Sequence, residues 1–262
     1  MVLTSGNRSD EPQSIDNTQA RQHLNGIADY YLMHNRDIAN RVDDSVVKII
    51  ANKTRFFRRA RGYAPEQITL PKGFENSNGF LALGADLKNT FCLVQHGKAT
   101  VSQHIGDLED FLTQRDFLHN LELYQKLLAF TPRHLVIDAH PNYHSSQIGK
   151  KVAHQLSIPL VTVFHHHAHI ASCLAESGVA INTKPVLGIT LDGLGYGSDS
   201  SLWGAEFLLA DYRDFTRVAH FKAAPLPGGN IANKQPWRNA FAQFVNAGWP
   251  QLSQRFNNTG IV

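Results

Sequence analysis

The stretch LVTVFHHHAH, residues 160–169, decides the fold, because an apolar strand pattern runs directly into a cluster of histidines. Residues 160–164 predict a buried strand, and the pattern of residues 165–177 is helical. The preceding segment repeats this arrangement, with a strand pattern at 134–138 and a helix pattern at 147–156. Strands that alternate with helices predict an α/β architecture.

The same patterns extend in both directions from these two strands. Three strands are expected upstream at 80–85, 90–95 and 99–104, then a helix at 111–130, and a further strand is expected downstream at 185–191. Polar residues and glycines stand where several of these strands end. That arrangement is typical of ligand sites at the carboxyl edge of an α/β sheet.

The first 70 residues form a separate compositional unit. They are expected to hold a short strand at 2–4, a helix at 18–33 and a strand at 46–51, followed by a cluster of lysine and arginine. Turn formers are concentrated at 71–79 and predict a linker. The expected division is therefore residues 1–70, a linker at 71–79, and residues 80–262.

The composition limits the class of protein. The 262 residues are 42% hydrophobic and 18% charged, with a formal net charge of only +3, which is ordinary for a soluble protein and does not favour nucleic-acid binding. Cys92 and Cys173 do not form a CxxC pair, so buried free thiols are expected rather than a disulfide framework or a thiolate zinc site. No apolar run is long enough to span a bilayer, and the first ten residues lack a signal-peptide pattern. We therefore expect a cytoplasmic protein without membrane association.

Four of the histidines fall within residues 165–169. If a helix begins at His165, then His165 and His169 are four residues apart and share one face, where two imidazoles can bind one metal ion. The glutamate of the HExxH zinc-protease motif is missing, and a catalytic metal usually has at least three protein ligands, so a third ligand must lie elsewhere. The alternative is a polar helix start or a hydrogen-bonded histidine pair.

The glycine-rich stretch LDGLGYG, residues 191–197, follows an expected strand. Such a loop lets backbone N–H groups approach a phosphate, and Asp192 at the strand end could hold a metal-bound water or a ribose hydroxyl. The stretch is neither a Walker A loop nor a GxGxxG motif. A plain hairpin turn explains it equally well.

A polar corner, GADLKNT, occupies residues 84–90 between two expected strands. A carboxylate and an ammonium group at a β-turn usually form a solvated tip. In the actin-like nucleotide-binding fold, however, the first hairpin is a phosphate loop, and this corner matches that position.

The segment PLPGGN, residues 225–230, predicts a tight loop, and Lys234 and Arg238 follow it four residues apart. Both could face an anion, or the segment could be a surface loop and a helix start. In the first unit, TSGN at residues 4–7 and the arginines at 55–61 offer hydroxyl, amide and guanidinium groups that suit phosphate recognition. The arginines fit a solvated strand edge equally well.

Taken together, these segments resemble the HypF family of hydrogenase-maturation carbamoyltransferases. Residues 4–7 look like the Ser-x-Asn element of YrdC-like domains, and three more segments are similar to the end of the HypF version of that domain: 34–38, 41–46 and 58–63. Other segments look like the start of its TsaD-like domain: 83–92, 102–108, 138–143 and the histidine cluster. The resemblance implies the end of a YrdC-like α/β domain followed by the N-terminal lobe of an actin-like (ASKHA, TsaD-like) nucleotide-binding domain.

The resemblance also implies a reaction. ATP and carbamoyl phosphate give carbamoyl adenylate, and the carbamoyl group passes to the C-terminal cysteine of HypE to become a cyanide ligand of the [NiFe] hydrogenase centre. HypE is thus the implied protein partner. A nucleic-acid partner is not favoured, although YrdC-like domains can bind RNA.

The resemblance assigns roles residue by residue. It implies a divalent metal, zinc or iron, on His165 and His169, and catalytic roles for Asp192, Lys234 and Arg238. It implies ATP or carbamoyl adenylate contacts for a larger set: Ser5, Asn7, Arg59, Arg61, Asp86, Lys88, Asn89, Gly193, Gly195, Gly228 and Gly229.

The sequence also departs from the family pattern. Asn230 and Ala205 stand where the family usually has Asp and Gly. The chain is expected to begin inside the YrdC-like domain and to stop inside the TsaD-like domain, with the family's third metal ligand outside it and poor solubility in isolation. Two alternatives therefore stay open: a catalytically incomplete fragment of the enzyme, and a tRNA threonylcarbamoyl transferase. The fusion of the two domains and the residues at 226–238 favour the HypF reaction over tRNA threonylcarbamoyl transfer.

Overall fold

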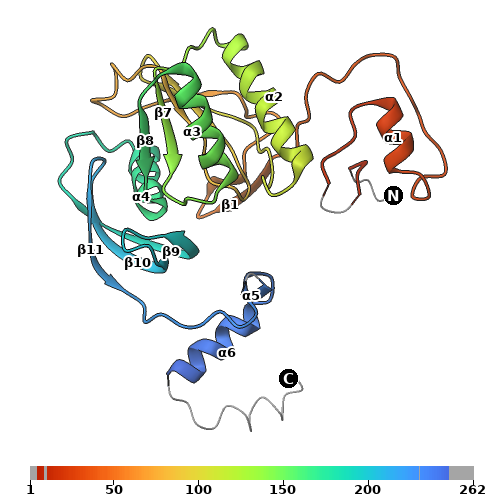
Figure 1. The fold of residues 1–262 in the computed structure, drawn as a ribbon. Helices are drawn as coiled ribbons and strands as arrows, with labels where there is room; N and C mark the ends of the chain where they lie inside the picture. The colour runs from red at the N-terminus through yellow and green to blue at the C-terminus, as the bar shows by residue number, and fades with distance from the viewer. Residues whose placement is uncertain (1–4, 9–10, 230, 248–262) are drawn as a thin grey trace. The chain divides into compact units, whose positions relative to one another are not determined.

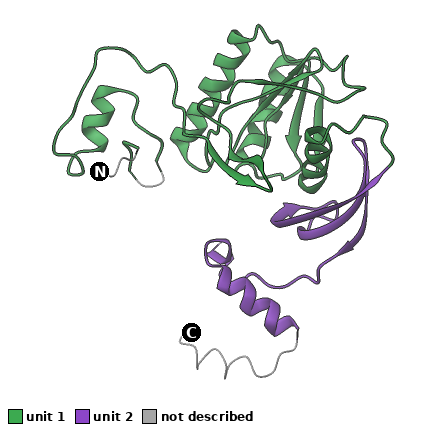
Figure 2. Cartoon of the chain, turned by 180° about the vertical axis from the view of Figure 1, so that it is seen from behind, with its two compact units in different colours: residues 1–184 green, residues 185–262 purple. Residues whose placement is uncertain are grey.

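The computed structural model describes residues 5–8, 11–229 and 231–247. The chain divides into two compact units, residues 1–184 and 185–262, which Figure 2 colours green and purple. The expected strand at residues 2–4 and Asn230 lie outside the described residues.

A short helix, α1 (Asn17–His23), opens the first unit. The Asp16 side chain caps it by accepting hydrogen bonds from the backbone N–H groups of Thr18 and Gln19. The helix was expected to reach residue 33 and is shorter, because the chain turns at Gly26, which has a φ of +80°. None of the described residues of α1 is buried, so packing does not extend the helix.

A hairpin follows, formed by β1 (Val46–Ile50) and β2 (Lys53–Arg58). Its turn is made by Ala51 and Asn52, both with positive φ, as a two-residue hairpin loop requires. The strand expected at 46–51 is confirmed. The basic cluster begins on β2, and most side chains of the hairpin are exposed.

The centre of the first unit is a mixed six-stranded sheet in the order β3-β6-β5-β4-β7-β8. Figure 1 labels two of its strands, β7 and β8. Strands β4, β7 and β8 are parallel, and β3, β6, β5 and β4 pair antiparallel in turn. The strands are β3 (Gln67–Thr69), β4 (Phe80–Ala82), β5 (Cys92–Gln95), β6 (Lys98–Val101), β7 (His134–Asp138) and β8 (Leu160–Val163). The predicted α/β class is confirmed.

Three helices belong to this sheet: α2 (Phe111–Leu127), α3 (His144–Leu156) and α4 (His165–Glu176). The core joins the sheet to α2 and α3 through side chains that are at most 5% exposed: Leu81, Leu83, Phe91, Leu93, Leu108, Phe117, Leu121, Tyr124, Phe130, Leu135, Ile137 and Ala153. Among the described helices, none has the length and apolarity that a membrane crossing requires.

Helix α3 begins three residues earlier than its apolar pattern indicates. The buried carboxylate of Asp86, which is 5% exposed, accepts hydrogen bonds from the backbone N–H groups of His144 and Ser145 at 2.9 and 3.0 Å. It therefore caps the helix from a loop that is 58 residues away in sequence. A sequence window around the helix does not contain this cap.

Gly149 lets α3 lie close to the sheet. A Cβ atom at this position would lie 2.3 Å from Cγ2 of Ile137 and 2.9 Å from Cδ2 of Leu135, both buried core residues. Only a residue without a side chain fits this contact without movement of the core.

The second unit is built on a three-stranded antiparallel sheet in the order β11-β10-β9. Its elements are β9 (Val186–Tyr196), β10 (Leu202–Ala210), β11 (Phe215–His220), α5 (Ile231–Lys234) and α6 (Pro236–Asn246). Strand β9 continues through the glycine-rich stretch to Tyr196, so residues 191–196 do not form the loop that was expected there, and the hairpin turn to β10 follows at residues 197–201. Gly195 pairs with Trp203, whereas the register shifts between Trp203 and Ala205, so that Gly193 lies at a bulge of the strand.

A partly buried ion pair joins β10 to β11. Arg217 on β11 donates two hydrogen bonds to the Glu206 carboxylate on β10, at 2.6 and 2.8 Å, and its guanidinium lies 4.2 Å from the centre of the Trp203 ring. Glu206 is 2% exposed. Its carboxylate raises the pKa of Arg217 above the ordinary value.

We expect Gly149→Ala to lower the free energy of unfolding of the first unit by about 1–3 kcal/mol, because the added methyl group must displace Ile137. Urea denaturation followed by far-UV circular dichroism measures this. Gly178→Ala is the control, since a Cβ at Gly178 meets no atom within 4 Å, although its φ of +71° adds some backbone strain. Equal stability of Gly149→Ala and the wild type would contradict the close packing.

We expect Arg217→Ala to destabilise the second unit by about 3 kcal/mol, because it leaves the buried Glu206 carboxylate without its partner. Tryptophan fluorescence is the measurement, since Trp203, Trp237 and Trp249 all lie in this unit. Lys222→Ala, at an exposed position of the same unit, should change stability by less than about 0.5 kcal/mol. Similar losses in the two variants would argue against the ion pair.

Candidate functional site

The parallel strands β7 and β8 end at the same edge of the sheet. Asp138, the last residue of β7, is in register with Val163 of β8, and His165 begins α4 directly after that strand. The Oδ2 atom of Asp138 lies 2.9 Å from Nδ1 of His165. Strand pairing therefore fixes which residues meet at this edge.

His165 and His169 occupy one face of α4. Their Nε2 atoms are 3.2 Å apart, and their ring planes are inclined at 86°. Two imidazole nitrogens bound to one tetrahedral ion, each at about 2.0–2.1 Å, would lie about 3.3 Å apart. The spacing of this pair therefore fits two ligands of a single divalent ion.

The other histidines of the cluster lie on a different side of the helix. His166 and His167 are buried, at 1% and 9% exposure, together with Ile170 and Leu174. The cluster thus separates into an inner pair that packs and an outer pair whose nitrogens converge. Cys173 is exposed on α4, so the expectation of a buried thiol fails there, because position 173 lies off the buried face of the helix.

The corner at residues 84–90 uses most of its polar side chains internally. Asp86 caps α3, and the Asn89 amide donates hydrogen bonds to the carbonyl oxygens of Leu83 and Ala85, at 2.9 and 2.5 Å. Asn89 is 1% exposed. The exposed residues of the corner are Gly84, Leu87 and Lys88, and the backbone N–H of Lys88 donates to Asp107. A ligand at this corner would meet backbone atoms, Leu87 and Lys88 rather than the two buried polar side chains.

A cavity of about 400 Å³ lies in the first unit and contains two of the expected nucleotide contacts, Ser5 and Arg61. Its remaining lining residues are Gln13, Ser14, Ile15, Ile38, Asn40, Arg41, Val42 and Asp44. Hydroxyl, amide and guanidinium groups predominate, and these suit phosphate and ribose recognition.

The other two expected contacts of this region have structural partners. The Asn7 amide donates to the carbonyl oxygens of Arg8 and Glu11, at 2.8 and 2.9 Å, and closes its own turn. Arg59 forms an ion pair with Glu66 at 3.1 Å. Neither residue lines the 400 Å³ cavity.

The loop at residues 225–229 turns at Gly228 and Gly229, which have φ values of +84° and +61°. A Cβ at Gly228 would lie 2.6 Å from Ile231 and 3.5 Å from the Arg238 guanidinium, so this turn and Arg238 are neighbours. Lys234 ends α5, whereas Arg238 belongs to α6. The four-residue spacing therefore does not place the two cations on one helical face, because Pro236 starts a new helix.

Asp192, Gly193 and Gly195 all lie on β9 in the second unit. Asp192 is half-buried, and Gly193 has Asn233 as the nearest side chain to a Cβ built there, at 3.6 Å. Any contact of these residues with a phosphate would therefore come from a strand rather than from a loop.

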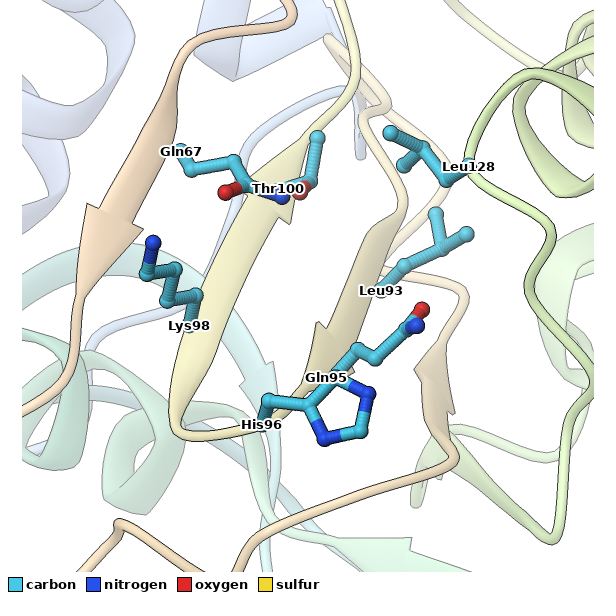
Figure 3. A pocket seen from close by; sticks show the side chains of 7 residues that line it. All are labelled: Gln67, Leu93, Gln95, His96, Lys98, Thr100 and Leu128. Carbon is cyan, nitrogen blue, oxygen red and sulfur yellow. The ribbon is translucent and has the colours of Figure 1, made fainter.

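A second, smaller cavity of about 170 Å³ lies against the sheet, between β3, β6, β5 and the end of α2 (Figure 3). It is lined by Gln67, Leu93, Gln95, His96, Lys98, Thr100 and Leu128. None of these is an expected site residue, and the cavity is separate from the histidine pair.

A polar junction ties the segment before β1 to the six-stranded sheet. The Asp43 carboxylate lies 2.7 Å from Nδ1 of His104 and accepts a hydrogen bond at 2.7 Å from Gln13, which lines the larger cavity. The pKa of Asp43 is held below its ordinary value of 3.8, first by the hydrogen bond with His104, then by the hydrogen bond from Gln13 and the positive charge of Arg58.

Three family models match the chain. The Sua5/YciO/YrdC model, described as telomere recombination, matches residues 1–60. The HypF Kae1-like domain matches residues 75–176, and the second subdomain of the carbamoyltransferase Kae1-like domain matches residues 188–260.

Curated relatives agree with these models. The chain is 43% identical to carbamoyltransferase HypF of Rhodobacter capsulatus, covering 97% of this chain and 34% of the relative. It is 42% identical to HypF of Synechocystis, covering 98% of this chain and 32% of the relative. The chain belongs to the HypF family. It spans about a third of the length of these HypF relatives.

Two solved HypF structures share the fold. Full-length HypF in its phosphate- and nucleotide-bound form matches with a TM-score of 0.81 and 45% identity over 92% of this chain and 37% of that one. HypF of T. kodakarensis matches with a TM-score of 0.81 and 36% identity over 93% of this chain and 31% of that one. The predicted order, a YrdC-like segment followed by a carbamoyltransferase domain, is confirmed.

The sequence did not mark Asp138 or Arg41 as site residues. Asp138 was visible as an acid at a strand end, but its link to His165 depends on the pairing of β7 with β8. Arg41 lines the larger cavity, which its spacing in the sequence does not indicate.

Asp43 is expected to make stability depend on pH in the acidic range. Because its pKa is lowered on folding, its contribution is fully present above the unfolded value of about 3.8 and is lost as pH falls through the lower folded value. Urea midpoints measured from pH 5 to pH 3 should fall less steeply for Asp43→Asn than for the wild type. Parallel pH profiles would show that the His104 contact does not stabilise the fold.

Proposed function

We propose that the chain supplies the histidine pair and part of the nucleotide-binding surface of an ATP-dependent carbamoyltransferase of hydrogenase maturation. The observation that carries this is the 3.2 Å approach of the His165 and His169 Nε2 atoms, held at the sheet edge beside Asp138. Membership in the HypF family supports the reaction class. The implied substrates are ATP and carbamoyl phosphate, and the implied acceptor is the C-terminal cysteine of HypE.

The larger cavity is the proposed place where the carbamoyl adenylate is contacted by the first unit. Arg61 and Arg41 are suited to the phosphate charge, and Ser5 and Asp44 can bond to hydroxyl groups. A relative was solved with phosphate and nucleotide bound, which supports a nucleotide ligand for this family. In this assignment Asn7 and Arg59 shape the region through Glu11 and Glu66 rather than by touching the ligand.

The outer histidines are the proposed ligands of a divalent ion, zinc or iron. When bound, the ion would act as a Lewis acid that polarises a carbamoyl or phosphate oxygen. His165 and His169 would hold the ion through two ring nitrogens, and the exposed Lys88 at the corner after β4 offers a cation for a phosphate or carbamoyl oxygen. The Asp86 carboxylate positions this corner against α3.

Roles for the second unit follow from the family resemblance. Asp192 is the proposed acceptor for a metal-bound water or a ribose hydroxyl, and Arg238 beside the Gly228–Gly229 turn is the proposed anion contact. Lys234, Gly193 and Gly195 are proposed as further contacts of the nucleotide or the carbamoyl group. Asp192→Asn should then lower the rate of carbamoyl transfer more than it lowers stability.

The metal assignment can be tested with Co²⁺ titrations of the purified chain. His165→Ala and His169→Ala should each raise the dissociation constant at least about 10-fold, because each removes one of few ligands. His167→Ala should leave the affinity of the folded fraction unchanged, although it costs stability because the side chain is buried. Equal loss of affinity in all three variants would exclude the proposed pair.

The reaction is tested by incubating the chain with ATP, carbamoyl phosphate and HypE. Pyrophosphate release reports adenylate formation, and mass spectrometry of the HypE C-terminal peptide reports transfer. Transfer that depends on His165 and His169 supports the proposal. Metal binding without either activity would show that the chain holds the metal site of the enzyme but not its catalytic capacity.

A further inference from the structure

We propose that Asp138 is a positioning residue that selects the tautomer and the ring orientation of His165. The consequence for metal affinity rests on the function proposed above, whereas the effect on the imidazole itself does not. Asp138 is not itself among the proposed metal ligands, and it would act on the site through its contact with His165.

The Asp138 carboxylate is fixed before any ligand arrives. Its side chain is 7% exposed, and its Oδ1 atom accepts a hydrogen bond from the backbone N–H of His140 at 2.7 Å. Its backbone carbonyl accepts a hydrogen bond from the Ser146 hydroxyl at 2.9 Å, which ties the end of β7 to α3. With Oδ1 engaged, Oδ2 is directed to His165.

This contact determines where the imidazole proton resides. A carboxylate oxygen accepts hydrogen bonds, so the 2.9 Å approach of Oδ2 to Nδ1 requires a proton on Nδ1 of His165. The neutral ring then carries its lone pair on Nε2, which is the atom 3.2 Å from His169 Nε2. The negative charge beside Nδ1 also makes Nε2 a stronger donor to an ion.

A second aspartate–histidine pair in the first unit provides a matched control. Asp43 Oδ2 lies 2.7 Å from His104 Nδ1, so the chemistry of the contact is the same. His104 is 15% exposed at its side chain, comparable with 20% for His165. His104 lies before α2 and is not part of the histidine cluster on α4.

The experiment combines two measurements on the full chain and on Asp138→Ala, Asp138→Asn and Asp43→Asn. The first is ¹⁵N NMR of the histidine rings in the metal-free chain, with His165 assigned by its absence in His165→Ala. The second is titration with Co²⁺ alone, followed by the visible absorption of the bound ion. Asp138→Asn keeps an acceptor oxygen and covers the case in which Asp138→Ala does not fold.

We expect the wild-type His165 ring to show Nδ1–H and Asp138→Ala to lose this preference. Asp138→Ala should weaken Co²⁺ binding about 10–100-fold, with Asp138→Asn in between, and Asp43→Asn should leave Co²⁺ affinity unchanged. An unaltered Nδ1–H signal in both Asp138 variants would overturn the proposal. An altered tautomer in a chain whose wild type does not bind Co²⁺ would support the positioning role and refute the proposed metal site.

Discussion

The parallel pairing of β7 with β8 is the constraint on which the candidate site depends. Backbone hydrogen bonds from Leu135 to Pro159 and from Ala139 to Val163, both 2.9 Å, fix the register at the two ends of the pair. In this register Asp138 and His165 leave the sheet at one edge. A shift of one residue would turn the Asp138 side chain to the other face of the sheet and break the contact.

Aspartate side chains cap the neighbouring helices α3 and α2, one from a distant position in the sequence and one locally. Asp86 reaches α3 from the corner after β4, whereas Asp110 caps α2 locally by accepting from Thr113. Helix α4 differs, because its N-cap residue is Phe164, whose side chain has no acceptor. Because α4 begins at His165, the positive end of its helix dipole lies at the edge where the His165 nitrogens are found.

The sequence predicted most strands of the six-stranded sheet, because strands such as 134–138 and 160–164 carry their signal in their own apolar residues. The burial expected for 160–164 is not observed, since residues 160–162 of β8 are exposed. The role of Asp86 depends on helix α3, which lies 58 residues further along the chain, so the sequence around residues 84–90 favoured the usual solvated tip. The glycines at 193 and 195 favoured a loop, and only the pairing of β9 with β10 shows that they belong to a strand.

The charges at this sheet edge favour a bound anion next to any metal ion held there. A divalent cation on two neutral imidazoles meets the positive end of α4, which disfavours it by about 0.3–1 kcal/mol. The buried Asp138 carboxylate contributes one negative charge beside His165, so a divalent ion and these residues together would still carry a net positive charge. A phosphate or carbamate oxygen would supply the missing negative charge while also interacting favourably with the helix dipole. An ion that carries a bound anion would therefore be less disfavoured by the α4 dipole than a bare ion.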